Sequence, residues 1–204
     1  MSNQLDPDAY LTVSRKGTGL YKDKGSKFLF FSFPVENEED IKSELASLRK
    51  TYFDATHYCY AWVLGPKGNQ FRANDDGEPN HSAGDPILGQ IRSHQLTNVL
   101  IVVVRYFGGT KLGVSGLIQA YKTSAALAIE ENEIIEKRVM EVLLIEFGYP
   151  QMNEVMKIVK AENLEIKSQE LGLDCQLRLE MRKGILEEVK EKLEEIEGLV
   201  IKSD

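Results

Sequence analysis

The sequence predicts an α+β protein with two domains, and three observations support this prediction. Its 204 residues are enough for one large domain or two small ones. Strand-like and helix-like patterns alternate along the chain. Charge is divided unevenly, because residues 1–138 hold 16 Lys and Arg against 17 Asp and Glu, whereas residues 139–204 hold 9 against 15. We therefore expect a first domain at 1–135 and a second domain at 136–204.

The first domain is expected to mix strands and helices. Segment 36–50 predicts a helix, because Ile41, Leu45 and Leu48 recur at helical spacing between an acidic first turn and a basic last turn. Segment 96–107 is a long apolar run, typical of a central strand buried on both faces. The other expected elements are strands at 10–21, 26–35, 56–65 and 69–75, helices at 87–95 and 115–132, and an interdomain linker at 130–138.

The second domain has a clearer pattern. Residues 138–148 are β-branched and apolar, as in a strand, and a helical stripe of apolar residues starts at Met152. Residues 175–182 alternate between apolar and polar side chains, which is typical of a strand with one face in water. The remaining elements are a strand at 164–171, a helix at 184–198 and a strand at 199–203. The resulting order βαββαβ predicts a ferredoxin-like sandwich.

Composition indicates a globular protein of a reducing compartment. The two cysteines, Cys59 and Cys175, lie far apart and form no CxxC pair, which argues against a disulfide framework. No apolar run reaches the ~18 residues needed to span a bilayer, and no signal-peptide pattern is present. The net charge of −7 disfavours a protein that coats nucleic acid non-specifically. We expect a cytoplasmic protein with no membrane contact and no cofactor.

A glycine-rich segment, "RYFGGTKLGVSG" at residues 105–116, is the first candidate site. A strand that feeds such a turn into a helix can bind an anion, because backbone N–H groups approach closely and the helix N-terminus is partly positive. The spacing matches neither GxxxxGK[ST] nor GxGxxG, so no nucleotide-binding motif is supported. A tight turn with Arg105 paired to a carboxylate is an equal alternative. The anion-binding or nucleic-acid-binding candidates are Arg105, Gly108, Gly109, Thr110 and Lys111.

The second candidate is the polar loop "NDDGEPNHSAGDP" at residues 74–86. Asp75, Asp76 and Glu78 can bind a hard cation such as Mg²⁺, and His81 can act as a base or a ligand. The loop lacks EF-hand or paired-histidine spacing, and Asx turns and helix caps explain its composition without a metal. We therefore expect no metal, with those three carboxylates as weak candidates.

The strand "THYCYAW" is the third candidate, because an alternating strand places Tyr58, Tyr60 and Trp62 on one face and His57 on the other. The aromatic side chains can stack bases on an open sheet, but burial beneath a helix is the favoured expectation. A structural, hydrogen-bonded role is favoured for the histidine. The candidates for a cleft between these segments are His57, Asp76, Glu78 and His81.

A resemblance to the YigZ/Impact family of translation-associated proteins is carried by the segments "NVLIVVVRYFGGTKLGVSGLIQAYKTSA", "NDDGEPNHSAGDPIL" and "FDATHYCYAW". The resemblance covers most of the first domain, and "RYFGGTKLG" looks like part of the family signature. The chain departs from many relatives at Asn80, His81 and Ser82, where those relatives have Ser-Gly-Thr.

The resemblance implies a first domain with the fold of the second domain of ribosomal protein S5. It also implies that the ferredoxin-like second domain is similar to the last domain of elongation factor G. Eukaryotic relatives regulate translation by binding a large activator of a stress kinase. Analogy of fold alone further suggests contact with RNA or the ribosome.

Two functions are therefore expected, of which the first is favoured because no complete catalytic motif is present. The first is a non-catalytic, translation-associated regulatory protein that binds RNA, the ribosome or a translation factor through its first domain. The alternative is a metal-dependent enzyme that acts on a phosphorylated small molecule or on nucleic acid, with the metal in loop 75–85 opposite the glycine loop.

Overall fold

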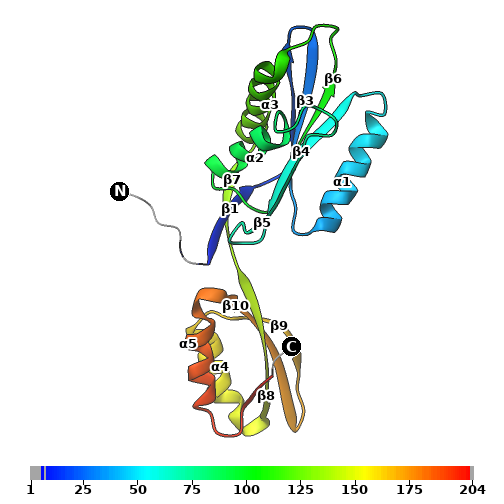
Figure 1. Ribbon diagram of the computed structural model, residues 1–204. Coiled ribbons are helices and arrows are strands. Elements are labelled where there is room, and N and C mark those ends of the chain that lie inside the picture. Colours follow the sequence, from blue (N-terminus) through cyan, green and yellow to red (C-terminus); the bar gives the residue numbers. More distant parts are fainter. Residues whose placement is uncertain (1–5, 7, 203–204) are drawn as a thin grey trace. The chain divides into compact units, whose positions relative to one another are not determined.

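A computed structural model describes residue 6 and residues 8–202, which divide into two compact units (Figure 1). The first unit is Tyr10–Lys137, and the second combines residues 138–202 with residue 6 and residues 8–9. Asp8 explains this membership, because its backbone oxygen accepts from Val139 N at 2.8 Å and its carboxylate accepts from Gly184 N at 3.0 Å. Such long-range bonds leave no local signal in the sequence, whose pattern predicts a first domain at 1–135.

The first unit is built on a five-stranded antiparallel sheet in the order β2-β3-β6-β4-β5. The strands are β2 (Gly17–Asp23), β3 (Ser26–Pro34), β4 (His57–Leu64), β5 (Gln70–Asn74) and β6 (Val99–Tyr106). Strand β6 lies in the centre, and its residues from Val99 to Val104 are fully buried. The expectation of a central strand buried on both faces is therefore confirmed.

Helices cover both faces of this sheet (Figure 1). Helix α1 (Glu38–Thr51) packs on one face, and α2 (Gly84–Ser93) and α3 (Gly113–Glu130) pack on the other. Because side chains alternate along a strand, β3 serves both cores. Its Phe28 and Phe30 face α2 and α3, whereas Phe31 and Phe33 belong to the core beneath α1.

Strand β4 divides its side chains in the same way. Tyr58 and Trp62 are buried in the core beneath α1, and Cys59 and Ala61 are buried in the core beneath α2 and α3. The favoured expectation that this aromatic stripe is core is confirmed. Tyr60 is half-buried against the same core as Trp62.

Two short segments differ from the expected pattern. Residues 10–21 hold two strands, the end of β1 (Ala9–Val13) and the start of β2, instead of one. Residues 134–138 form strand β7 (Ile134–Arg138), which pairs with β1, so part of the segment expected as a linker is a strand, and the two units divide within that segment, between Lys137 and Arg138. Its partner lies more than a hundred residues away in the chain, and pairing of that range is invisible to local periodicity.

The second unit contains the predicted element order βαββαβ, which is confirmed. Its strands form an antiparallel sheet in the order β11-β8-β10-β9, and helices α4 and α5 pack on one face of it (Figure 1). The elements are β8 (Met140–Gly148), the turn η1 (Tyr149–Gln151), α4 (Met152–Ala161), β9 (Glu165–Glu170), β10 (Asp174–Arg182), the turn η2 (Lys183–Ile185), α5 (Leu186–Glu194) and β11 (Val200–Lys202).

Candidate functional site

A buried ion pair joins the glycine segment to the acidic loop. Arg105, near the end of β6, directs Nη1 to Oε1 of Glu78 at 2.5 Å, and both side chains are more than nine-tenths buried. Its Nη2 lies 3.4 Å from Ser26 Oγ, and its Nε has no hydrogen-bond partner. Arg105 is thus paired with a carboxylate, one of the two arrangements that the sequence left open.

Glu78 connects this pair to two other elements. Its Oε1 also accepts a hydrogen bond from the Tyr121 hydroxyl of α3 at 2.8 Å. Its Oε2 lies 3.9 Å from Nε2 of His57, at the start of β4. The structure therefore brings together His57, Glu78 and Arg105, three of the predicted site residues.

Asp76 holds the loop against β4 and α1. Its carboxylate accepts from Arg49 Nη2 and from the backbone N of Tyr58, each at 2.7 Å. Its carbonyl oxygen lies 2.8 Å from Nδ1 of His57. Because a carbonyl oxygen only accepts, this bond requires a hydrogen on Nδ1. Asp76 thus positions the histidine instead of facing solvent.

Asp75 and His81 are joined by a hydrogen bond, in which the backbone N of His81 donates to Oδ2 of Asp75 at 2.8 Å. One carboxylate oxygen of Asp75 accepts from the backbone N of Ala83 and of Gly84, at 2.9 and 2.8 Å, and so caps the first turn of α2. The imidazole of His81 is 80% exposed and bonds Asp85. His81 therefore lies apart from the buried pair.

The weak metal candidates Asp75, Asp76 and Glu78 thus bond different partners. Over the residues that the structure describes, no group of three or more His, Cys, Asp or Glu side chains is arranged to hold a metal ion. The carboxylates bind backbone N–H groups, arginines and a tyrosine instead.

Two neutral groups complete the buried cluster. The thiol of Cys59 lies 3.0 Å from the carbonyl oxygen of Asp75 and 3.3 Å from the Tyr121 hydroxyl. Burial raises the pKa of the Cys59 thiol above its ordinary range. Burial, and then the neighbouring Cys59 and Glu78, raises the pKa of the Tyr121 phenol in the same direction. Both groups are protonated at neutral pH, so Cys59 is not a nucleophile there.

The glycine loop packs against the turn between β2 and β3. A Cβ on Gly108 would lie 1.9 Å from the carbonyl carbon of Gly25, so only glycine fits this contact. The backbone N of Gly108 donates to Ser26 Oγ at 3.2 Å. Gly109 has φ +85° and open space around it, and Thr110 and Lys111 are exposed. The sequence did not indicate Ser26, because it is remote in the chain and reaches Arg105 through the pairing of β3 with β6.

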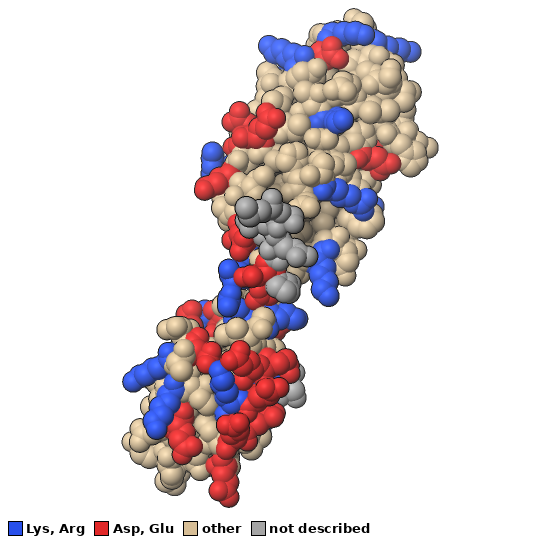
Figure 2. All heavy atoms as spheres, turned by 90° about the vertical axis from the view of Figure 1, so that its left-hand side faces the viewer, with Lys and Arg blue, Asp and Glu red and all other residues tan. Residues whose placement is uncertain are grey.

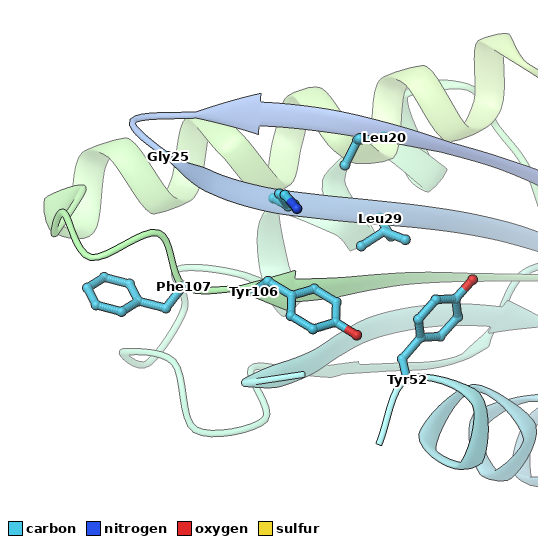
Figure 3. Close-up of a pocket in the computed structure, with 7 residues that line it drawn as sticks. Leu20, Gly25, Leu29, Tyr52, Tyr106 and Phe107 are labelled. Atoms are coloured by element: carbon cyan, nitrogen blue, oxygen red, sulfur yellow. The ribbon is translucent and has the colours of Figure 1, made fainter. Parts of the chain in front are cut away.

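A cavity of about 430 Å³ lies on the sheet face that carries α1, beside the glycine loop (Figure 3). Sequence reasoning missed it, because its walls come from separate parts of the chain that carry no common motif. Loop 75–86 does not line it. The lining residues are Leu20, Gly25, Lys27, Leu29, Tyr52, Tyr106 and Phe107.

These features define a two-unit protein of mixed helices and antiparallel sheets, whose first unit holds a buried Arg–Glu pair beneath a glycine loop. The family model of the Impact N-terminal domain matches residues 24–129, which include the whole of this site. The chain belongs to the Impact family, as its sequence segments predicted.

Relatives match both units. The chain is 30% identical over 159 residues to the IMPACT family member YvyE of Bacillus subtilis, covering 78% of this chain and 73% of that protein. It is 31% identical over 157 residues to the IMPACT family member YigZ of Escherichia coli, covering 76% and 74%. The chain is also similar to a crystal structure described as that of a hypothetical protein. The match covers 97% of this chain and 98% of that chain, with 26% identity and a TM-score of 0.73.

Among the described residues, no helix has the length and apolar character needed to cross a bilayer.

Proposed function

We propose that the chain is a non-catalytic, translation-associated regulatory protein that binds RNA, the ribosome or a translation factor through its first unit. Membership of the Impact family supports the link to translation, which the family resemblance implies. A cytoplasmic location is part of the proposal, because translation takes place there.

A finer assignment of the two folds belongs to the same proposal. We assign the first unit to the fold of the second domain of ribosomal protein S5, and the second unit to the ferredoxin-like class. The order βαββαβ and the sheet order β11-β8-β10-β9 support the second assignment. Both classes host many functions, so the function is argued from the site.

One observation carries the proposal of a binding role. The carboxylates of Asp75, Asp76 and Glu78 in loop 75–86, and the imidazole of His57 beside them, are bonded to the protein itself, with the Arg105–Glu78 pair at their centre. This arrangement supports a structural role for the loop, because its carboxylates already accept hydrogen bonds from other groups of the protein. The exposed groups next to it are then the surface available to a partner.

That surface is cationic. The turn that carries Lys24 touches the glycine loop that carries Lys111, through the contact of Gly25 with Gly108. Within the described part of the chain, Lys22, Lys24 and Lys111 form no ion pair. Figure 2 shows Lys and Arg side chains at the upper end of the first unit, and many Asp and Glu side chains on the second. Phosphate groups suit such unpaired lysines.

Co-sedimentation with ribosomes and filter binding of structured RNA, each over a series of salt concentrations, test the proposal. We expect binding at low salt that weakens steeply as salt rises. The double variant Lys24→Ala/Lys111→Ala should reduce both the affinity and the salt dependence, whereas Lys67→Ala, in the turn between β4 and β5, should not. Absence of binding to RNA, ribosomes and translation factors at low salt would exclude the proposed function.

A further inference from the structure

The sheet face that carries α1 is uncovered at the end where β2, β3 and β6 meet the glycine loop. The core beneath α1 contains Phe31 and Val104, but Leu20, on the same face of β2, is 47% exposed. The cavity of about 430 Å³ occupies this end, and its volume lies within the range of roughly 300–1,000 Å³ typical of ligand pockets. The open end of the sheet is therefore hollowed.

Three aromatic residues line the cavity, and Figure 3 shows the rings of Tyr52 and Tyr106 over the sheet, whereas the ring of Phe107 points away from both. The Tyr106 hydroxyl donates to Oδ1 of Asp54 at 2.8 Å, which holds its ring in place. The side chain of Phe107 is 48% exposed, although aromatic side chains are usually buried. An exposed ring beside an open sheet, such as that of Phe107, is a platform on which proteins stack unpaired bases.

Two lysines lie directly opposite each other on the same face. In the pairing of β2 with β3, Lys22 is the partner of Lys27, and Leu20 is the partner of Leu29. Like charges directly opposite on neighbouring strands are destabilising. Both lysines are exposed, and neither forms an ion pair within the described residues. A bound anion would relieve this repulsion.

A third lysine extends the charge along the strand. The Nζ atom of Lys16 lies 4.7 Å from the centre of the Phe33 ring, which places it on the face of α1. Six residues separate Lys16 from Lys22, which is about 20 Å along a strand. Residues 15–27 contain five basic residues and one acidic residue, in a chain of net charge −7. Lys16, Lys22 and Lys27 thus form a line of positive charge beside the cavity, which we call the cation track.

We propose that this face binds single-stranded RNA, with one base entering the cavity beside Tyr52 and Tyr106, a neighbouring base stacking on the exposed ring of Phe107, and the phosphates following Lys16, Lys22 and Lys27. The inference rests on the proposed function and specifies the surface and the form of RNA. Bases inside a duplex are stacked on one another and cannot enter a cavity lined by rings, so a duplex is a poor ligand.

Fluorescence anisotropy with a labelled single-stranded oligoribonucleotide and its duplex tests the inference. We expect the single strand to bind more tightly than the duplex. Phe107→Ala should weaken the binding of the single strand at least about fivefold, the loss expected for one stacked base. Phe107→Tyr keeps a ring and should retain the affinity. Phe71→Ala removes a comparably exposed ring, 50% exposed on β5, and should have no effect.

The cation track has a separate readout. In the double variant Lys22→Ala/Lys27→Ala, the slope of log affinity against log salt should become shallower by about 1.4, for two phosphate contacts on a single strand. The thermal midpoint should not fall, because the change removes a repulsion. A lower midpoint would mean that the two lysines stabilise the folded state.

The outcomes separate the inference from the proposed function. If the wild type binds RNA and the Phe107 and lysine variants bind equally well, the inference fails and the proposed function stands. If the duplex binds as tightly as the single strand, or an acidic peptide displaces the RNA at lower concentration than unlabelled RNA, the inference is also overturned. If the wild type binds ribosomes but no free RNA, the inference fails alone.

Discussion

Arg105 and Glu78 form an ion pair between the central strand and the acidic loop, with 2.5 Å between Nη1 and Oε1 and side-chain exposures of 6% and 4%. A buried pair is costly to desolvate, but removing one partner costs more, because the other charge is left buried. We expect Glu78→Gln or Arg105→Ala to reduce the free energy of unfolding by about 3–5 kcal/mol.

Urea unfolding followed by fluorescence of Trp62 measures this change, because Trp62 is the one tryptophan of the chain and lies in the first unit. Glu39→Gln, which removes an exposed pair with Lys42, should leave the midpoint unchanged. The double variant Arg105→Met/Glu78→Leu should recover part of the loss. Single variants as stable as the wild type would show that the pair is not needed for the stability of the first unit.

Gly108 and Gly89 provide a matched test of close backbone packing. A Cβ on Gly108 would collide with the backbone of Gly25, whereas a Cβ on Gly89, in α2, would meet nothing within 4 Å. Gly108→Ala should therefore destabilise the first unit by about 1–3 kcal/mol. Gly89→Ala should stabilise it by up to about 1 kcal/mol, because alanine favours the helix. Equal effects of the two substitutions on the urea midpoint would contradict this account.

Asp75 should act as a cap and not as a metal ligand. Asp75→Ala removes the acceptor for the backbone N of Ala83, Gly84 and His81 and should cost about 1–2 kcal/mol, as for other helix caps. Asp75→Asn keeps one acceptor, the amide oxygen, and should lower the free energy of unfolding by less than Asp75→Ala. Thermal unfolding with and without Mg²⁺ checks the interpretation, since a metal ligand predicts stabilisation by Mg²⁺ that both variants lose.

Alkaline pH should destabilise the first unit through Tyr121 and Cys59. Their pKa values are raised in the folded state, mainly by burial. The unfolded chain therefore loses these protons first, near the ordinary pKa values of about 8.5 for Cys and about 10 for Tyr. Their contribution is complete below about pH 8.5 and declines as the pH rises further. The urea midpoint followed by circular dichroism should fall over this window.

Tyr121→Phe removes one of these titrations and should make the alkaline decline less steep, even if the variant is less stable at neutral pH. Tyr149→Phe changes a tyrosine that is 64% exposed and should leave the decline as it is in the wild type. Equal slopes in all three proteins would show that burial of Tyr121 does not contribute to the pH dependence.

Local pattern was sufficient for most elements, because each depends on neighbours in the chain. The stripe of Ile41, Leu45 and Leu48 predicted α1, and the alternation at 175–182 predicted β10. The glycine-rich segment identified the family. Its glycines have a physical reason, because a contact such as that of Gly108 with Gly25 leaves no room for a side chain.

The partners of the site residues could not be obtained in this way. Glu78 and Arg105 were both candidates, but nothing in a one-dimensional pattern says that they bond each other and leave Lys111 exposed. That depends on the loop after β5 folding back over the end of β6. The cavity depends even more on register, because pairing of Lys22 with Lys27 and of Phe28 with Arg105 sets which side chains share a face. A shift by one residue would turn every side chain of a strand to the opposite face, so long-range pairing controls this surface while local periodicity controls the elements beneath it.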